Sequence, residues 1–283
     1  MKTILVTGGN GQLASCIKDI QSNYSDLKFI YKNSSEFNIT DKKQVTSFFE
    51  TNSINWCINC AAYTAVDHAE TESDLAFKVN VEGVKFLAEA CKKQHTTLIH
   101  VSTDFVFKGN SSQPYTELDT PDPINVYGAS KLEGEKQIES ILDTYFIIRT
   151  SWLYSKHSNN FVKTMLRLAD ERDEISVVND QIGSPTYAID LATVILHIIN
   201  KDSKTFGLYH FSNRGEVSWY QFALAIFNVF HRNMKVHSID TSHYKTVAQR
   251  PKYSVLETSK IEKTLQIKIR DWKTALIEFA QSQ

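Results

Sequence analysis

The stretch that most constrains the fold lies at the start of the chain. Residues 3–7 are a short apolar run, residues 8–14 form a glycine-containing turn, and a helical pattern continues to about residue 23. A strand, a glycine turn and a helix in this order are typical of the first unit of a dinucleotide-binding sheet. Gly8 and Gly11 allow the backbone to approach a pyrophosphate, whose negative charge the helix N-terminus favours. Ala14 occupies the third small position of the motif.

The rest of the first half alternates between strand and helix patterns. Strands are expected at residues 27–31, 54–60, 97–101 and 145–149, and helices at residues 41–51, 70–94 and from about 126. Such alternation predicts a parallel sheet covered by helices on both faces. We therefore expect an α/β fold with a Rossmann-type doubly wound parallel sheet, in which residues 1–150 form the NAD(P)-binding domain.

After residue 150 the regular alternation fades. Helices are expected at residues 159–170, 188–200, 218–230 and 271–281, and strand-like segments at 175–178 and 207–211. A chain of 283 residues is long enough for a nucleotide-binding domain with a smaller appendage. Residues 151–283 are expected to form mainly a smaller C-terminal substrate-binding lobe, with some elements returning to the sheet.

Composition argues against several classes of protein. The net charge of -1 gives no reason to expect nucleic acid or an anionic membrane as a partner. No stretch approaches the roughly 20 apolar residues that cross a bilayer. The chain also reaches Gly8 too early for a signal peptide, so a cytoplasmic protein is expected.

The cysteines and histidines predict neither a redox pair nor a metal site. Cys57 and Cys60 have the spacing of a redox Cys-x-x-Cys motif. Residues three apart on a strand face opposite sides, however, so their side chains would lie too far apart for a disulfide. The nine histidines show no metal-ligand spacing, and no metal is expected.

Tyr127 and Lys131 are a candidate acid–base pair. If the run around them is helical, they lie four residues apart on one face. An ammonium beside a phenol lowers the phenol's pKa from about 10, which would let Tyr127 exchange a proton with a substrate oxygen. On spacing alone, an exposed amphipathic helix that happens to carry both residues is the simpler interpretation. The polar residues 102–104 follow the fourth predicted strand, where doubly wound sheets bind ligands.

The end of the second predicted strand bears on the choice of cofactor. An acidic residue near this point would bind the ribose hydroxyls of NAD. Here Lys32 and residues 33–35 follow the strand, with no carboxylate before Glu36. Lys32 and the two serines would suit a 2′-phosphate, which favours NADPH with NADH also accepted. A solvated loop lysine is an equally good interpretation of Lys32.

Seven ordered runs carry a resemblance to a known family. They are residues 10–13, 61–67, 102–107, 125–135, 149–152, 159–161 and 179–186. The glycine turn, the threonine after the fourth strand and the Tyr-x-x-x-Lys helix resemble the extended short-chain dehydrogenase/reductase family. Within it, the chain is similar to the dTDP-4-dehydrorhamnose reductases over nearly its full length.

The resemblance implies an NAD(P)H-dependent enzyme that reduces the 4-keto group of a deoxysugar on a nucleoside diphosphate. The product, L-rhamnose or a close deoxysugar, would feed surface polysaccharide synthesis. Tyr127 would protonate the carbonyl oxygen, and Thr103 would hydrogen-bond to the same oxygen. Lys131 would hold the nicotinamide ribose and tune Tyr127.

The resemblance also implies a set of binding residues. Those expected at the cofactor, besides Tyr127, Lys131 and Lys32, are Gly8, Gly11, Gln12, Leu13, Asn38, Ile39, Ala62, Tyr63 and Thr64. Those expected at the substrate are Thr103, Asp104 and Trp152. A packed core aromatic is the alternative for Trp152. Asn80 would steady its helix or take part in a proton relay.

Two positions depart from the family pattern. Asn38 stands where the family often has an aspartate, and an amide can still hydrogen-bond near the adenine. Some relatives dimerise through a magnesium ion held by carboxylates, one of them just after the glycine turn. Ser15 and Cys16 occupy that region here, and neither is a hard anionic oxygen ligand. A monomer and a homodimer both remain open.

Two other functions stay open beside the leading one. The first is reduction of a related nucleotide 4-keto-sugar, such as a precursor of 6-deoxytalose or of an N-acetylated sugar. The second is a non-catalytic regulatory subunit similar to the methionine adenosyltransferase beta subunit, since a fold does not prove a function. The presence of Thr103, Tyr127 and Lys131 together favours catalysis.

Overall fold

A six-stranded parallel sheet forms the centre of the molecule. The structure, a computed structural model, describes residues 1–283. Its strands are β1 (Lys2–Thr7), β2 (Leu27–Lys32), β3 (Trp56–Asn59), β4 (Thr97–Thr103), β5 (Tyr145–Thr150) and β10 (Gly207–His210), in the order β10-β5-β4-β3-β1-β2. The chain leaves β1 on one side for β2 and returns to the other side for β3, so the order reverses next to β1. Doubly wound sheets bind their ligands at such a point. The predicted fold class is confirmed.

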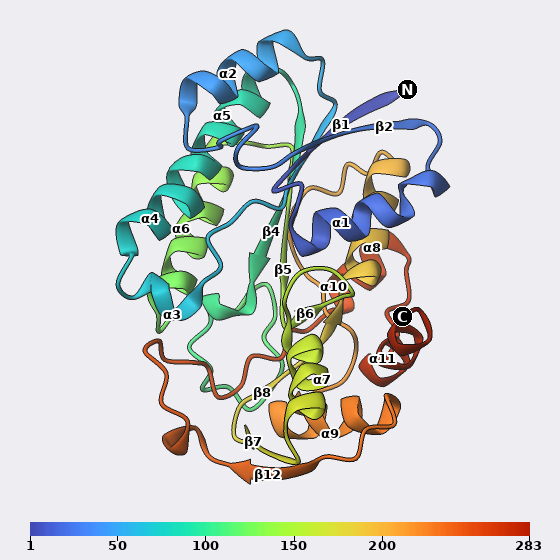
Figure 1. The fold of residues 1–283 in the computed structure, drawn as a ribbon. Helices are drawn as coiled ribbons and strands as arrows, with labels where there is room; N and C mark the ends of the chain where they lie inside the picture. Colours follow the sequence, from blue (N-terminus) through green and yellow to red (C-terminus); the bar gives the residue numbers. More distant parts are fainter.

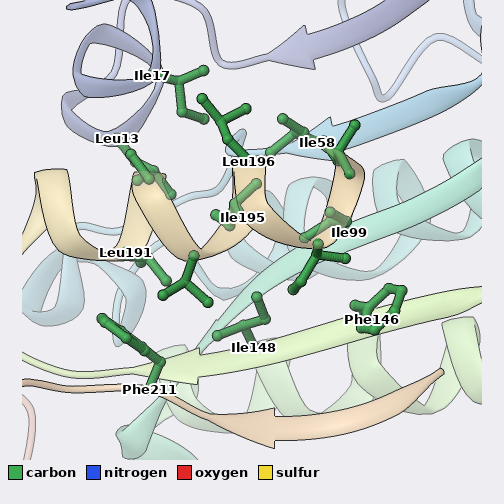
Figure 2. Close-up of a cluster of buried hydrophobic side chains, with 14 of the residues drawn as sticks. Leu13, Ile17, Ile58, Ile99, Phe146, Ile148, Leu191, Ile195, Leu196 and Phe211 are labelled. Atoms are coloured by element: carbon green, nitrogen blue, oxygen red, sulfur yellow. The ribbon is translucent and has the colours of Figure 1, made fainter. Parts of the chain in front are cut away.

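Helices cover both faces of this sheet (Figure 1). Helices α1 (Gln12–Ile20) and α8 (Ala188–Asn200) lie on one face, and α2 (Lys42–Thr51), α5 (Val84–Lys93) and α6 (Val126–Ile141) on the other. Figure 2 shows the first of these two cores, where Leu13 and Leu191 of the helices pack with Ile58 and Ile99 of the strands. Each such fully buried aliphatic side chain contributes about 1.5–3 kcal/mol. The sheet is therefore a rigid base for the loops at its edge.

Strand β3 shows how the sheet is buried on both faces. Ile58 packs in the core with α1 and α8, whereas Cys57 packs in the core with α2 and α5. Cys60 lies against the α1 and α8 side. The two cysteines of the Cys-x-x-Cys spacing are thus on opposite faces of the sheet, as the strand pattern predicted, and all four cysteines are free thiols.

The long helix predicted at residues 70–94 is interrupted, so that prediction was wrong in detail. The segment begins with two short helices, α3 (Val66–Ala69) and α4 (Ser73–Phe77), and then widens into a π-helix at Lys78–Gly83 before α5 continues. Inside the wide turn, Asn80 is buried and its amide hydrogen-bonds away from its own helix. A side-chain pattern with a period of 3.6 residues does not reveal this local change of winding.

The second half of the chain builds a smaller lobe below the sheet in Figure 1. Helices α7 (Phe161–Glu171), α9 (Trp219–Val229) and α11 (Trp272–Gln281) pack around Tyr154, Phe222 and Phe279. Short strand pairs complete it: β7 (Glu174–Val178) with β12 (Lys235–Ile239), β8 (Ile182–Gly183) with β11 (Val217–Ser218), and β6 (Leu153–Tyr154) with β9 (Thr186–Tyr187). A further helix, α10 (Ser259–Leu265), lies near β10.

Two elements of the second half belong to the sheet layer. Strand β10 pairs with β5, and α8 packs against α1 on the face of the sheet. The helices expected at 159–170, 188–200, 218–230 and 271–281 are present within two residues of those bounds. None of the helices combines the length and the apolar character needed to cross a membrane.

Candidate active site

A cleft of about 1130 Å³ lies at the C-terminal edge of the sheet and extends to the lobe. Loops after β1, β2, β3 and β4 line it, together with the start of α6, residues 150–153, Ser158, Asn159 and Phe161. Because parallel strands end at the same edge, these loops meet although they are far apart in sequence. Every predicted site residue except Lys32 lines this one cleft.

The glycine turn after β1 forms one wall. Gly8 has a φ of +64°, and a side chain there would place its Cβ 2.8 Å from the backbone N of Ala61. Only glycine therefore allows the β1 loop and the β3 loop to lie this close. Gly11 precedes the first turn of α1, which has no side-chain cap. The backbone N–H groups of this first turn and the positive end of the helix dipole fit a dinucleotide pyrophosphate.

Gln12 makes contacts that the sequence does not indicate. Its Oε1 accepts hydrogen bonds from Ser155 Oγ at 3.0 Å and Asn160 Nδ2 at 2.9 Å. Its Nε2 donates to the carbonyl of Leu153 at 3.1 Å. Gln12 thus joins the first helix of the sheet layer to the start of the lobe, in addition to lining the cleft.

Lys32 is the one predicted site residue that lies outside the cleft lining. Its ammonium is 6.0 Å from the centre of the Phe48 ring, and the residue is not part of the cleft lining. Side chains alternate along β2, and the cleft lining begins at residue 33, directly after the strand ends. Asn33, Ser34 and Ser35 line the cleft in its place.

Two further segments carry residues predicted at the cofactor. Asn38 and Ile39 line the cleft after β2, and Ala62, Tyr63 and Thr64 line it after β3. Asn38 Oδ1 accepts from the backbone N and the hydroxyl of Thr40, which holds its own turn together. Asn80 binds both backbone groups of Tyr63 and also donates to Ser130 Oγ at 2.9 Å. Asn80 therefore fastens the β3 loop to α6.

Helix α6 brings Tyr127 and Lys131 to the cleft. Asn125 caps the helix by accepting from the backbone N of Gly128 at 2.7 Å. At Gly128 a Cβ would lie 2.1 Å from the carbonyl oxygen of Phe105, so glycine permits the helix to begin directly against the β4 loop. The ring of Phe105 packs edge-on against Tyr127, with the centroids 5.7 Å apart.

The protonation of the pair differs from the prediction. Burial raises the pKa of Tyr127 to about 12, with the Thr103 hydroxyl acting in the opposite sense and Asp104 adding to the rise. Lys131 is not among the groups that lower it, since its Nζ is directed away, to the carbonyl of Val101 at 2.8 Å and to His100 Nε2 at 3.1 Å. Burial also lowers the pKa of Lys131 to about 8. The predicted lowering of the phenol pKa was therefore wrong.

Thr103 and Asp104 end β4 at the floor of the cleft. Thr103 Oγ1 contacts Asp104 Oδ1 at 3.1 Å, and the backbone N of Phe105 donates to the threonine at 3.2 Å. Asp104 is 2% exposed, and burial raises the pKa of its carboxyl to about 6. Its Oδ2 and the Ser102 hydroxyl are buried without a hydrogen-bond partner. Such orphaned groups at a cleft are suited to receive a polar ligand.

Trp152 forms the wall towards the lobe. Its backbone φ is +44°, a strained conformation for a bulky residue. Its indole stacks on Trp219 with the centroids 3.4 Å apart and the planes at 9°. Gly183 makes room for it, since a Cβ there would lie 2.6 Å from the indole. Trp152 is therefore packed, as its alternative interpretation proposed, and it also lines the cleft.

Sequence reasoning missed two residues at this site. Trp219, the first residue of α9, lines the cleft beside Trp152. His100 lies behind the cleft, where its Nε2 is 3.1 Å from Lys131 Nζ. A histidine inside the apolar run 97–101 was the available signal, since a polar ring in a buried strand needs a partner.

Fold and site together define a class. A doubly wound parallel sheet, a glycine turn at its switch point and a Tyr-x-x-x-Lys helix beside a strand-end threonine are the features of a nicotinamide-dependent oxidoreductase of the short-chain dehydrogenase/reductase type.

Comparison with known proteins narrows this class. The family described as RmlD substrate binding domain matches residues 1–283. A dTDP-4-dehydrorhamnose reductase of Aggregatibacter actinomycetemcomitans is 42% identical over 286 residues, which is 98% of this chain and 97% of that protein. A crystal structure of dTDP-4-dehydrorhamnose reductase from Bacillus anthracis in complex with NADP matches with a TM-score of 0.97 and 39% identity, covering 100% of both chains. A dTDP-4-keto-6-deoxy-D-glucose reductase of Streptomyces niveus is 34% identical over 86% of this chain and 84% of that protein. The chain belongs to the dTDP-4-dehydrorhamnose reductase family, a family of NAD(P)-dependent nucleotide-sugar reductases.

Proposed function

We propose that the protein reduces dTDP-4-dehydro-β-L-rhamnose to dTDP-L-rhamnose, a precursor for surface polysaccharide. The observation that carries this proposal is the meeting of Thr103, Tyr127 and Lys131 in one cleft that also contains a glycine turn suited to a dinucleotide. A sugar carbonyl beside Thr103 and Tyr127 would find two hydroxyl groups able to donate to its oxygen.

The roles of the three residues follow from their protonation. Bound nicotinamide would supply a hydride to the carbonyl carbon. Because its pKa is about 12, the Tyr127 phenol keeps its proton at neutral pH and is available as the general acid for the oxygen. The Thr103 hydroxyl donates to the same oxygen as negative charge develops there. The Lys131 ammonium holds the ribose of the cofactor and stabilises the phenolate left by proton transfer.

NADPH is the proposed cofactor, with NADH as a weaker substitute. Asn33, Ser34 and Ser35 line the cleft after β2, and no carboxylate lines it there. A carboxylate at this point would bind the 2′-hydroxyl of NAD and repel a 2′-phosphate, whereas hydroxyl and amide groups can donate to the phosphate. The relative from Bacillus anthracis was crystallised with NADP.

A related 4-keto-sugar is the second candidate substrate. The relative from Streptomyces niveus is named for dTDP-4-keto-6-deoxy-D-glucose, an isomer of the first candidate. The two sugars present the same reacting group, so selection between them depends on the wall formed by Trp152 and Trp219. A non-catalytic subunit would not require Thr103, Tyr127 and Lys131 to share one cleft, which argues against that alternative.

The test follows the absorbance of NADPH and, separately, NADH with freshly prepared dTDP-4-keto-6-deoxy-L-lyxo-hexose and with dTDP-4-keto-6-deoxy-D-glucose. We expect rapid oxidation of NADPH with the first sugar and slower oxidation with NADH. Turnover of the D-glucose derivative, without turnover of the first sugar, would support the second candidate substrate in place of the first. Binding of NADPH without oxidation by either sugar would contradict both.

A further inference from the structure

His100 occupies an unusual place for a histidine, in the middle of the buried strand β4. It is fully buried, and so are Thr7, Asn59 and Lys131 beside it, at 2% exposure or less. Asn59 Nδ2 lies 2.9 Å from His100 Nδ1, and His100 Nε2 lies 3.1 Å from Lys131 Nζ. The imidazole thus joins the ends of β1 and β3 to the lysine of the catalytic helix, in a line of buried polar groups.

The hydrogen bonds of Asn59 determine which ring nitrogen carries the hydrogen. Asn59 Oδ1 faces the Thr7 hydroxyl at 2.6 Å and the backbone N of Ala61 at 3.2 Å. The amide N–H of Ala61 can only donate, so the acceptor oxygen of Asn59 must face it. The Asn59 amide nitrogen then faces His100 Nδ1, which must accept. The hydrogen of the neutral imidazole is therefore on Nε2, directed at Lys131.

This tautomer matters because an N–H and an ammonium are both donors. A neutral lysine amine can accept from Nε2–H and donate to the carbonyl of Val101, 2.8 Å away. In that state every polar group in the line from Thr7 to Lys131 is satisfied. The protonated lysine instead meets a donor where it needs an acceptor.

We propose that His100 is a positioning residue for Lys131, which fixes its head group at the floor of the cleft and, through the tautomer set by Asn59, favours release of its proton. The inference rests on the proposed function, because it gives Lys131 a role beside Tyr127. A lysine that exchanges its proton near neutral pH can return a proton to the phenolate after each turnover, whereas a lysine of ordinary basicity would retain it.

The other groups around Lys131 act in known directions. Burial is the main cause that lowers the pKa of Lys131, to about 8, while Glu135 on its own helix and Cys60 after β3 act to raise it. Glu135 is itself paired with Arg149 at 2.6 Å. His100 on β4 is neutral, since burial and the neighbouring lysine hold its pKa well below the usual range. His100 is thus the one directional partner that discriminates between the amine and the ammonium.

The test measures the titration of Lys131 directly in the full-length protein. Lysine labelled with ¹³C at Cε gives NMR signals that shift with protonation, and the Lys131 signal is the one lost in Lys131→Met. The informative variant is Asn59→Asp. A carboxylate that accepts from Thr7, Ala61 and His100 Nδ1 stays ionised, so it moves the imidazole hydrogen to Nδ1 and turns Nε2 into an acceptor for the ammonium.

We expect Asn59→Asp to raise the pKa of Lys131 by about one unit or more. Combining it with His100→Phe should remove at least half of that rise, because the charge of the aspartate remains but the tautomer switch is gone. His210→Phe is the matched control, since His210 is equally buried, is held neutral by burial and does not contact Lys131; its ring contacts the carbonyl of Tyr115 and Arg149 Nη1. It should leave the titration of Lys131 unchanged.

Activity provides a second readout. His100→Phe should lower kcat roughly tenfold with little change in the KM for NADPH, and His100→Gln, which restores an N–H near the position of Nε2, should recover most of the loss. An unchanged Lys131 titration in Asn59→Asp, or a His100→Phe variant with wild-type kcat, would overturn the inference. Absence of turnover in the wild-type protein would instead overturn the proposed function, and the NMR titration would still decide the role of His100.

Discussion

Tyr127 combines two properties that suit a proton donor in a reduction. It is held against Phe105 at the cleft, and burial keeps its phenol protonated at neutral pH. Lys131 Nζ is directed to the carbonyl of Val101 and to His100 Nε2. The phenol is therefore already in the state from which it can protonate an alkoxide.

The role of Tyr127 can be tested by removing only its hydroxyl. Tyr127→Phe should lower turnover by roughly 10²-fold or more, because the ring still packs against Phe105 but no longer offers a proton. NADPH binding, followed by quenching of protein fluorescence, should be largely retained. A variant that keeps wild-type turnover would show that another group protonates the sugar oxygen.

Asp104 predicts a pH dependence of stability. Its pKa is raised from the usual 3.8 to about 6, so the folded protein binds this proton more tightly than the unfolded chain does. The stabilising effect of that proton is complete at acid pH and is lost as the pH rises through 6. Asp104→Asn cannot ionise, and so it escapes the cost of a buried carboxylate.

Urea unfolding at two pH values measures this effect. The stability of Asp104→Asn relative to wild type should be greater at pH 8 than at pH 5, by about 1 kcal/mol. The difference between the two pH values is the readout, because any constant effect of the amide cancels. An equal offset at both pH values would show that Asp104 titrates normally and is better hydrated than the structure indicates.

At the scale of elements, the π-helix at Lys78–Gly83 and helix α6 are built to lie very close together. A Cβ at Gly134 would be 2.2 Å from the carbonyl oxygen of Asn80. In the same region the side chain of Asn80 donates a hydrogen bond to Ser130, which lies four residues before Gly134 on α6. This close approach places the helix that carries Tyr127 and Lys131 at the edge of the cleft.

Gly134→Ala tests whether the close approach is real. In an ordinary helix this change stabilises by about 1 kcal/mol, whereas here the methyl group must push the two helices apart, at a cost of about 1–3 kcal/mol. We expect a net loss of stability in urea unfolding followed by circular dichroism. Ser140→Ala, at an exposed position of the same helix, should change stability by less than about 0.5 kcal/mol. A stabilised Gly134→Ala protein would rule out the tight contact.

The elements differ in how far the sequence could predict them. Helix α8 begins and ends at the predicted residues because its apolar residues, which pack on the sheet, leave no competing pattern. The π-helix was not predictable, since Asn80 within it hydrogen-bonds to Tyr63 and Ser130, which are distant in sequence, and local patterns do not contain such contacts. The same contrast holds for the site. The sequence could predict that Tyr127 and Thr103 share a cleft, because this follows from the order of the strands. The depth of burial, which reverses the expected pKa of Tyr127, and the direction of Lys32 depend on packing that local patterns do not contain.

At the scale of the whole molecule, two contacts join the sheet to the lobe across the cleft. Gln12 at the start of α1 binds Ser155 and Asn160, and Trp152 after β5 stacks on Trp219 of α9. The first contact lies beside the glycine turn and the second lies at the far wall. The lobe is thus positioned by residues that also line the site.

Trp219 should therefore affect the sugar more than the cofactor. Trp219→Ala removes the ring that stacks on Trp152 at the cleft wall, and we expect the KM for the nucleotide sugar to rise roughly tenfold or more. The affinity for NADPH should change less than about twofold, because the glycine turn is not touched. Trp219→Phe keeps an aromatic face and should stay near wild type. An equal weakening of NADPH binding and of sugar binding would show that Trp219 does not act on the sugar alone.

The proposed reaction transfers a hydride to C4 of a nucleotide-linked sugar in this cleft, with Tyr127 as proton donor. The most direct measurement uses NADPH deuterated at the transferable position of the nicotinamide, with the product examined by NMR. We expect deuterium at C4 of a dTDP-6-deoxysugar formed by the wild-type protein, and a rate lowered roughly 10²-fold or more in Tyr127→Phe. A product without deuterium at C4, or equal rates for the two proteins, would contradict it.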